Sequence, residues 1–285
     1  MGIALTAMQV DVTTRLGAHA PATPTGFPTL DRMLNGGLRS GTVLAIAGAP
    51  GVGRTAFALL LAYMAARAKA GVVFASASLD PTEVMARLAA RALHREYPDS
   101  HTPYGMIWSG QAWQEPATHR AVADALETVV KKVGAQLHLY RALGLEATTS
   151  LAECAAHQCS RHERAALVVD DIEAFSAVGD GAISHSGAAN GSMEGRVSAV
   201  AYDLRRIADQ QGCSVVFTTL ARHAEFVAPP ATLAGELREV PDAHNEPGEL
   251  RMELYVYKNR VGEGGVVPLR FVPGAGLFEE PKPQP

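Results

Sequence analysis

Short apolar runs alternate along the chain with longer segments that mix apolar and polar residues. Runs such as 42–47 (TVLAIA) and 166–170 (ALVVD) are almost continuously apolar, which is typical of strands buried inside a parallel sheet. The longer segments between them fit helices. We therefore expect strands at 42–47, 72–75, 136–140, 166–170 and 214–219, and helices at 55–70, 80–95, 117–132, 149–162 and 194–211.

This alternation predicts βαβ units and an α/β domain with a mainly parallel sheet flanked by helices. The tail differs, because segments 251–258 and 266–272 alternate with period two around four residues rich in glycine, which predicts a C-terminal β-hairpin. Three stretches have loop composition. They are 98–115, 179–191 and 226–248. We expect a loose N-terminal arm over 1–24, one α/β domain over 25–280 and a short tail over 281–285.

Composition narrows the class of protein. No apolar run approaches the roughly 18–20 residues of a membrane span, so we expect no membrane association. Three cysteines among 285 residues do not make a disulfide framework, which favours the reducing cytoplasm. The net charge of −4 argues against a polycationic wrapper of nucleic acid, so any contact with DNA must use a local basic track.

The strongest chemical signal is a glycine-rich loop at 48–55 (GAPGVGRT), between a predicted strand and a predicted helix. Such a loop curls its backbone N–H groups around a phosphate at a helix N-terminus, which predicts an ATP site. The predicted nucleotide-binding residues are Gly48, Pro50, Gly51, Gly53, Arg54 and Thr55. Thr55 supplies the hydroxyl expected on Mg²⁺.

Two further residues refine this ATP site. Asp170 ends an apolar strand, where a carboxylate would orient the Mg²⁺ shell. Arg54 stands where the loop usually has lysine, and its planar fork replaces a compact ammonium. Nucleotide binding is therefore a safer prediction than fast hydrolysis.

The sequence resembles the C-terminal ATPase domain of the DnaB-type replicative helicases, a RecA-like fold. The resemblance lies in 25–33 (TGFPTLDRM), 53–59 (GRTAFAL), 78–80 (SLD), 167–170, 215–221 and 258–262 (KNRVG). It spans about residues 25–280. The related RadA and KaiC groups share the turn at 36–38 (GGL), so the subfamily is less defined than the fold.

The resemblance implies a homo-oligomer, a hexameric ring with ATP at subunit interfaces, and replication or recombination proteins as partners. Lys258 and Arg260 would reach the γ-phosphate bound by the neighbouring subunit, and Asp80 would be the catalytic carboxylate that activates water. The alternative for Lys258 and Arg260 is a pair of solvated charges on one strand face.

Several departures from the family pattern suggest slow hydrolysis. Besides Arg54, Asp80 stands where the family has glutamate, and Thr219 where it has glutamine. Water positioning is sensitive to errors on the order of 1 Å. Glu83, Asp171 or Glu173 could act as the base instead.

The resemblance also places single-stranded DNA at the loops after the 166–170 and 214–219 strands. These loops offer Arg196, Arg222 and Arg238 but few aromatic residues for stacking. They could equally be plain surface loops.

Two function classes follow. The first is a helicase or translocase acting on single-stranded DNA with ATP and Mg²⁺. The second is a regulatory or assembly protein that binds nucleotide without hydrolysing it. A zinc site from Cys154, His157, Cys159 and His162 is disfavoured, because on one helix these residues spread over more than roughly 150°.

Overall fold

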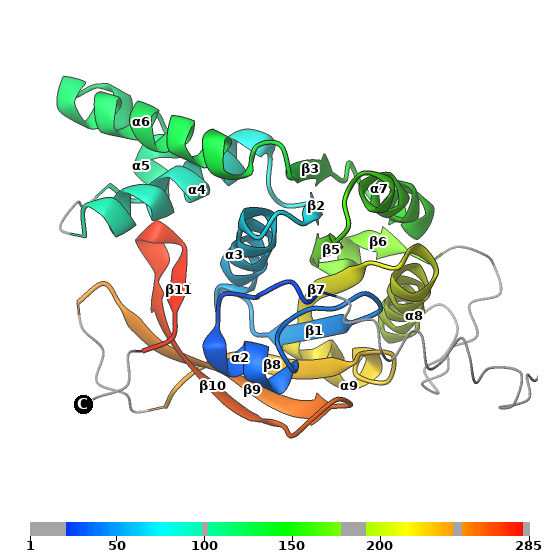
Figure 1. Cartoon of the computed structure of the whole chain (residues 1–285). Coiled ribbons are helices and arrows are strands. Elements are labelled where there is room, and N and C mark those ends of the chain that lie inside the picture. Colours follow the sequence, from blue (N-terminus) through cyan, green and yellow to red (C-terminus); the bar gives the residue numbers. More distant parts are fainter. Residues whose placement is uncertain (1–20, 99–101, 178–191, 242–246, 282–285) are drawn as a thin grey trace, which may run out of the picture.

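The computed structural model describes residues 21–98, 102–177, 192–241 and 247–281. Its centre is a nine-stranded sheet (Figure 1). Across the sheet the strands follow the order β11 (Leu277–Glu279), β10 (Gly265–Val272), β9 (Leu250–Asn259), β8 (Leu233–Glu239), β1 (Val43–Gly48), β7 (Ser214–Leu220), β5 (Ala165–Asp170), β2 (Gly71–Ser76) and β3 (Leu137–Arg141). Two short strands, β4 (Glu146–Ala147) and β6 (Phe175–Ser176), pair separately.

The sheet has a parallel part and an antiparallel part. Every neighbouring pair from β8 through β1 to β3 is parallel, whereas β8, β9, β10 and β11 run antiparallel to one another in turn. Strand β8 is therefore the boundary between the two parts. The predicted α/β fold, with a mainly parallel sheet and a C-terminal hairpin formed by β9 and β10, is confirmed.

Helices cover both faces of the sheet. They are α2 (Pro28–Met33), α3 (Arg54–Arg67), α4 (Pro81–Glu96), α5 (Tyr104–Trp108), α6 (Pro116–Val133), α7 (Thr148–Arg161), α8 (Met193–Gln211) and α9 (Ala224–Val227). Short 3-10 turns are η1 (Gln111–Trp113), η2 (Ile172–Ala174), η3 (Ala221–His223) and η4 (Pro273–Ala275).

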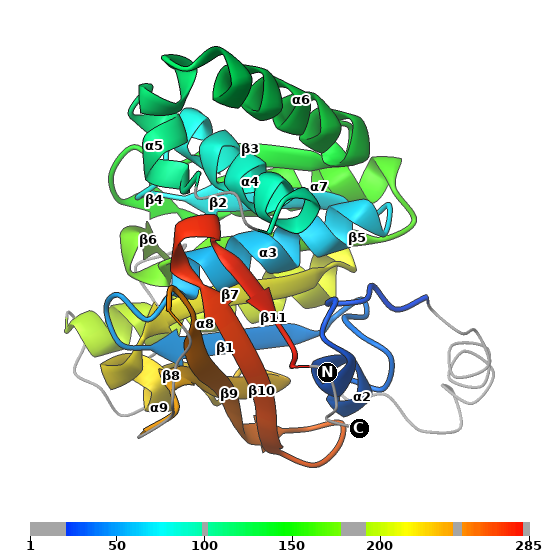
Figure 2. The same ribbon diagram turned by 90° about the vertical axis from the view of Figure 1, so that its left-hand side faces the viewer.

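Alternate residues of the strands enter two different cores. On β1, Leu44 and Ile46 pack with α2, α3 and α4, whereas Val43 and Ala45 pack with α7, α8 and α9. The period-two direction of side chains on a strand separates these two sets. A third cluster joins α4, α5 and α6 above the first core (Figure 2). The result is a three-layer arrangement in which every central strand is buried on both faces.

Two segments expected to be loops contain regular structure, so those predictions were wrong. Segment 226–248 contains the whole of β8, which pairs with β1 on one side and β9 on the other. Segment 98–115 contains α5 and η1, which pack their buried Ile107 and Ala112 against α4 and α6. Segment 179–191 lies outside the described residues.

The predicted N-terminal arm falls mostly outside the described residues. Its last part is held in place, because Thr23 and Leu38 exchange both backbone hydrogen bonds of an isolated bridge, at 2.7 and 2.8 Å. Within the part of the chain that the structure describes, no helix is long and apolar enough to span a bilayer.

Candidate nucleotide site

The glycine-rich loop lies where β1 turns into α3. Gly51 and Gly53 have φ angles of 81° and 96°, which glycine adopts without the cost that other residues bear. A Cβ at Gly53 would also lie 3.0 Å from the rings of Phe271 and Phe278. The loop can therefore approach a ligand closely at the N-terminus of α3, where backbone N–H groups favour an anion.

Asp170 meets Thr55 beneath this loop. The Thr55 hydroxyl donates to Asp170 Oδ1 at 3.1 Å, Thr218 donates to the same oxygen at 3.1 Å, and Ser76 donates to Oδ2 at 3.0 Å. Asp170 is fully buried, and that burial raises its pKa against the opposing effect of these hydrogen bonds. The pair that sequence analysis assigned to Mg²⁺ is thus brought together, and its hydroxyl and carboxylate oxygens suit that ion.

Arg54 turns toward the strand end rather than into solvent. Its Nη1 lies 2.9 Å from Asp171 Oδ1, but the two atoms are not aligned for a hydrogen bond, and neither has another partner among the described residues. Asp171 has a φ of 59°, rare for a residue with a side chain. Burial raises its pKa to about 6, and Asp170 adds to this while Arg54 opposes it. A largely buried guanidinium beside the loop, with one nitrogen that has no hydrogen-bond partner in the described part of the chain, fits an anionic ligand.

A cavity of about 470 Å³ opens beside the loop and contains residues that the sequence did not indicate. Tyr104, Phe271 and Pro273 give it an apolar wall, and the Arg87 guanidinium lies 4.0 Å above the Tyr104 ring. Tyr104 was missed because it lies in a segment read as a loop. Phe271 was missed because it lies near the other end of the chain from the glycine-rich loop.

The predicted catalytic Asp80 caps α4. Its Oδ1 accepts hydrogen bonds from the backbone N–H groups of Thr82 at 2.7 Å and Glu83 at 3.0 Å. The Glu83 N–H bond is the main cause of the lowered pKa of Asp80. The structure thus gives Asp80 a structural task, and its catalytic role stays a prediction.

The alternative bases are also engaged. Glu83 forms an ion pair with Arg87 at 2.7 Å. Glu173 Oε1 accepts from the Thr219 hydroxyl at 2.7 Å, from Leu220 N–H at 2.8 Å, and lies 2.8 Å from Nδ1 of the buried His223. Thr219, at the position where the family has glutamine, is therefore directed to Glu173.

Lys258 lies near the end of β9 and Arg260 directly follows the last residue of that strand, and both lie away from the glycine-rich loop. The Lys258 ammonium donates to the backbone carbonyls of Ala228 and Pro229, and Arg260 donates to Pro229 at 2.6 Å. In register, Lys258 pairs with Ala234 of β8, which pairs with Ala45 of β1. Arg260 lies further toward the end of the sheet at which β1 begins. The glycine-rich loop lies at the opposite end, because it follows Gly48, the last residue of β1.

The three arginines proposed for DNA have different surroundings. Arg196 contacts the Met193 sulfur, and Arg222 donates to His223 at 3.3 Å. Arg238 lies in β8 and is bound to Glu253 at 2.6 Å, with Tyr255 4.5 Å from its guanidinium. The expectation that Arg238 lies in a loop was wrong.

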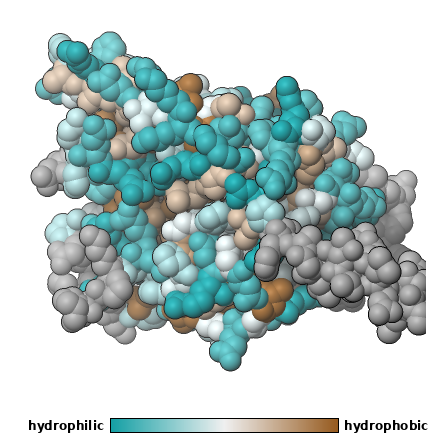
Figure 3. Space-filling model, viewed as in Figure 1, coloured by the Kyte–Doolittle hydropathy of each residue, from teal (hydrophilic) through white to brown (hydrophobic). Residues whose placement is uncertain are grey.

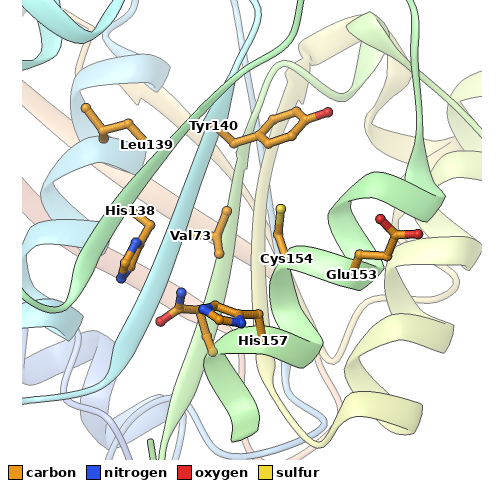
Figure 4. A pocket seen from close by; sticks show the side chains of 8 residues that line it. Val73, His138, Leu139, Tyr140, Glu153, Cys154 and His157 are labelled. Carbon is orange, nitrogen blue, oxygen red and sulfur yellow. The ribbon is translucent and has the colours of Figure 1, made fainter. Parts of the chain in front are cut away.

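The Cys/His group divides between two places. Cys154 and His157 line a separate cavity of about 350 Å³ between β3 and α7, together with His138 (Figure 4). Cys159 instead contacts the buried Cys213 through a thiol–thiol hydrogen bond that lowers its pKa. Burial lowers the pKa of His138, and His157 and His162 add to this.

Together, the glycine-rich loop after β1, the Thr55–Asp170 pair and the parallel sheet define a P-loop protein of the RecA-like class. Within that class, the family model for the DnaB-like helicase C-terminal domain matches residues 22–240, so the chain belongs to this family. No protein of curated function matches the sequence.

Solved structures agree on the fold. One solved ATPase domain superposes with a TM-score of 0.77 at 17% identity, covering 99% of this chain and 100% of that one. A DnaB-like replicative helicase, solved in a study of its interactions with primase, gives 0.74 at 17% identity, covering 98% of this chain and 67% of that one.

Proposed function

We propose that the chain binds ATP with Mg²⁺ at the P-loop, assembles head to tail into a hexameric ring, and acts on single-stranded DNA as a slow helicase or translocase. The observation that carries the nucleotide site is the Thr55–Asp170 hydrogen bond beneath a loop whose glycines adopt positive φ. When bound, Mg²⁺ would neutralise charge on the β- and γ-phosphates. Thr55 and Asp170 would hold it.

The position of Lys258 supports the oligomer. Strand β9 runs antiparallel to β8, so Lys258 and Arg260 lie toward the edge where β1 begins. The P-loop follows Gly48, which lies three residues beyond Ala45 and so about 10 Å further along β1 than the register position of Lys258. Both cations donate to the backbone carbonyls of the 228–229 segment and so are directed away from their own P-loop, whereas the P-loop of a neighbouring subunit could receive them.

The surroundings of the carboxylates support slow hydrolysis. Asp80 caps a helix, Glu83 pairs with Arg87, and Glu173 accepts from three donors. In each of these carboxylates one oxygen is already engaged, which restrains the orientation of the side chain. The same facts favour the second function, a regulatory protein that binds ATP without hydrolysing it.

Two arginines at the P-loop edge support a contact with DNA. Arg196 lies in the first turn of α8, and Arg222 lies in η3, which follows β7. The two elements are close, because Arg222 and His223 add to the lowering of the pKa of Glu194 on α8, whose main cause is its own backbone N–H. Arg238 is a weaker candidate, because Glu253 already neutralises it.

The test combines nucleotide binding with turnover. We expect Thr55→Ala to weaken Mg²⁺-dependent ATP binding about tenfold, because it removes a metal ligand. Affinity is measured with a fluorescent ATP analogue, with and without Mg²⁺. The matched control is Thr118→Ala on α6, which loses only an exposed hydrogen bond from the Thr118 hydroxyl to Glu115. Equal affinities of the wild type and Thr55→Ala would contradict the assigned site.

Turnover separates the two functions. The motor requires measurable ATP hydrolysis by the wild type that rises when single-stranded DNA is added. A wild type that binds ATP but shows no turnover in either condition would favour the regulatory protein.

A further inference from the structure

A second large cavity lies away from the P-loop, between α2, α3, α4 and the β10–β11 pair, with a volume of about 1180 Å³. Figure 2 shows β10 and β11 in front of α3, with α4 above it. The α2 side is joined to the chain after β11, because Glu280 accepts hydrogen bonds from Thr29 N–H at 2.8 Å and from the Thr29 hydroxyl at 2.9 Å.

Arg91 forms part of the cavity wall and is unusual for a charged residue. It is only 5% exposed, and its Nε has no hydrogen-bond partner among the described residues. Its guanidinium lies 4.4 Å from the centre of the Tyr63 ring, and Nη2 lies 3.9 Å from the Met64 sulfur. Burying a cation without a carboxylate is costly, so a ligand that supplies negative charge would relieve a real penalty.

Four more arginines line this cavity, and two of them, Arg67 and Arg95, act electrostatically on Arg91. Arg95 lies one turn after Arg91 on α4, Arg67 ends α3, and both are exposed. Their positive charges lower the pKa of Arg91, although burial is the main cause and Tyr63 opposes it. In the described part of the chain, no acidic side chain forms an ion pair with any of these three arginines.

The acidic residues of the cavity are committed elsewhere. Glu279 pairs with Arg270 at 2.9 Å, and Arg270 also binds Glu249. Glu280 accepts two hydrogen bonds from Thr29, which leave its charge in place, but the exposed Arg32 in the same wall balances that charge. Arg67, Arg91 and Arg95 thus line one cavity, and among the described residues none of the three forms an ion pair. A dianionic phosphate group balances them better than a single carboxylate, and guanidinium groups match its oxygens with paired hydrogen bonds.

Part of the wall is apolar. Phe27, Leu60 and Phe278 line the same cavity, and the volume exceeds that of a phosphate several-fold. The face drawn in Figure 3 is mainly hydrophilic, with small, separated brown patches. We propose that the cavity between α3, α4 and β11 binds a small phosphorylated molecule, with its phosphate on Arg67, Arg91 and Arg95 and its apolar part on Phe27 and Phe278.

The probes are orthophosphate and phenyl phosphate, titrated by calorimetry at a pH where both are dianions. Phenyl phosphate is expected to bind about tenfold more tightly, because its ring adds apolar contact. Equal affinities would overturn the apolar half of the proposal.

Variants separate this cavity from the P-loop. The double variant Arg67→Gln/Arg95→Gln alters only exposed side chains, so it should fold, and it should weaken phenyl phosphate binding at least about tenfold. Arg91→Met should do the same. Arg120→Gln/Arg161→Gln removes two exposed charges from α6 and α7 and should leave binding unchanged.

Arg54→Gln, at the P-loop, should also leave the cavity's binding in place. If phenyl phosphate binding were lost in Arg54→Gln but kept in Arg67→Gln/Arg95→Gln, the cavity proposal would be overturned. That result would leave the proposed ATP site unaffected. A further arm adds an oligonucleotide without terminal phosphates. Displacement of phenyl phosphate by this competitor would assign the cavity to a nucleic-acid backbone instead.

Discussion

At the scale of single residues, Arg54 is the position at which the P-loop departs from the usual lysine. An arginine keeps the positive charge but divides it over a broad, planar group. Here Arg54 Nη1 lies 2.9 Å from Asp171 Oδ1. Asp171 itself has a φ of 59°, which residues with a side chain rarely adopt. The cation is thus directed to the end of β5 as much as to a ligand in the loop.

We predict that Arg54→Lys raises ATP turnover about tenfold, because a compact ammonium can leave Asp171 and follow the phosphate charge. Steady-state phosphate release at saturating ATP measures this. Arg120→Lys, an exposed change on α6, is the control. A turnover equal to or below that of the wild type would show that Arg54 is not the element that slows hydrolysis.

At the scale of elements, Asp80 is the cap of α4. We predict that Asp80→Ala lowers the free energy of unfolding by about 1 kcal/mol and that Asp80→Asn retains most of it, since asparagine caps nearly as well. Denaturant unfolding of both variants gives these values. Turnover of Asp80→Asn is then informative, because a capping residue would leave it near wild type and a catalytic base would abolish it.

Strand β8 depends on a close approach at Gly235. A Cβ there would lie 3.0 Å from the carbonyl oxygen of Tyr255 and 3.1 Å from a Leu254 methyl. We predict that Gly235→Val destabilises the protein by roughly 1–3 kcal/mol, because neither the backbone nor the packed side chain can move away freely. Thermal melting compared with Gly105→Val, where a Cβ meets no atom within 4 Å, tests this. Equal melting temperatures would contradict it.

The apolar runs were enough to predict the parallel strands and their helices, because strands buried on both faces carry a strong signal. Strand β8 escaped prediction because its sequence, LAGELRE, combines a glycine with two glutamates and no β-branched residue. Its place depends on β1 and β9, which lie far away in the sequence. Within the site, the Thr55–Asp170 pair followed from motif spacing, whereas Tyr104 and the Arg54–Asp171 pair depend on tertiary packing.

At the scale of the whole molecule, the proposed ring can be tested by mixing two inactive proteins. Thr55→Ala keeps Lys258 and Arg260 but has a defective P-loop, and Lys258→Ala/Arg260→Ala has the reverse. We predict that each alone shows little turnover and that an equal mixture recovers about a quarter of the wild-type rate, the share of interfaces that randomly join two intact halves.

Light scattering with Mg-ATP must first show that both variants assemble as the wild type does. A mixture no more active than its components, despite shared oligomers, would contradict the use of Lys258 and Arg260 across an interface.

The antiparallel course of β9 has a further consequence for how activity depends on the amount of protein. In the proposed ring, where Lys258 and Arg260 complete the site of a neighbour, a lone chain has no complete site, an open row of chains has one fewer complete site than it has chains, and only a closed ring completes every site. The rate of ATP turnover per chain should therefore rise with protein concentration and reach a plateau at the concentration where the rings are complete. Dilution alone would switch such a protein off.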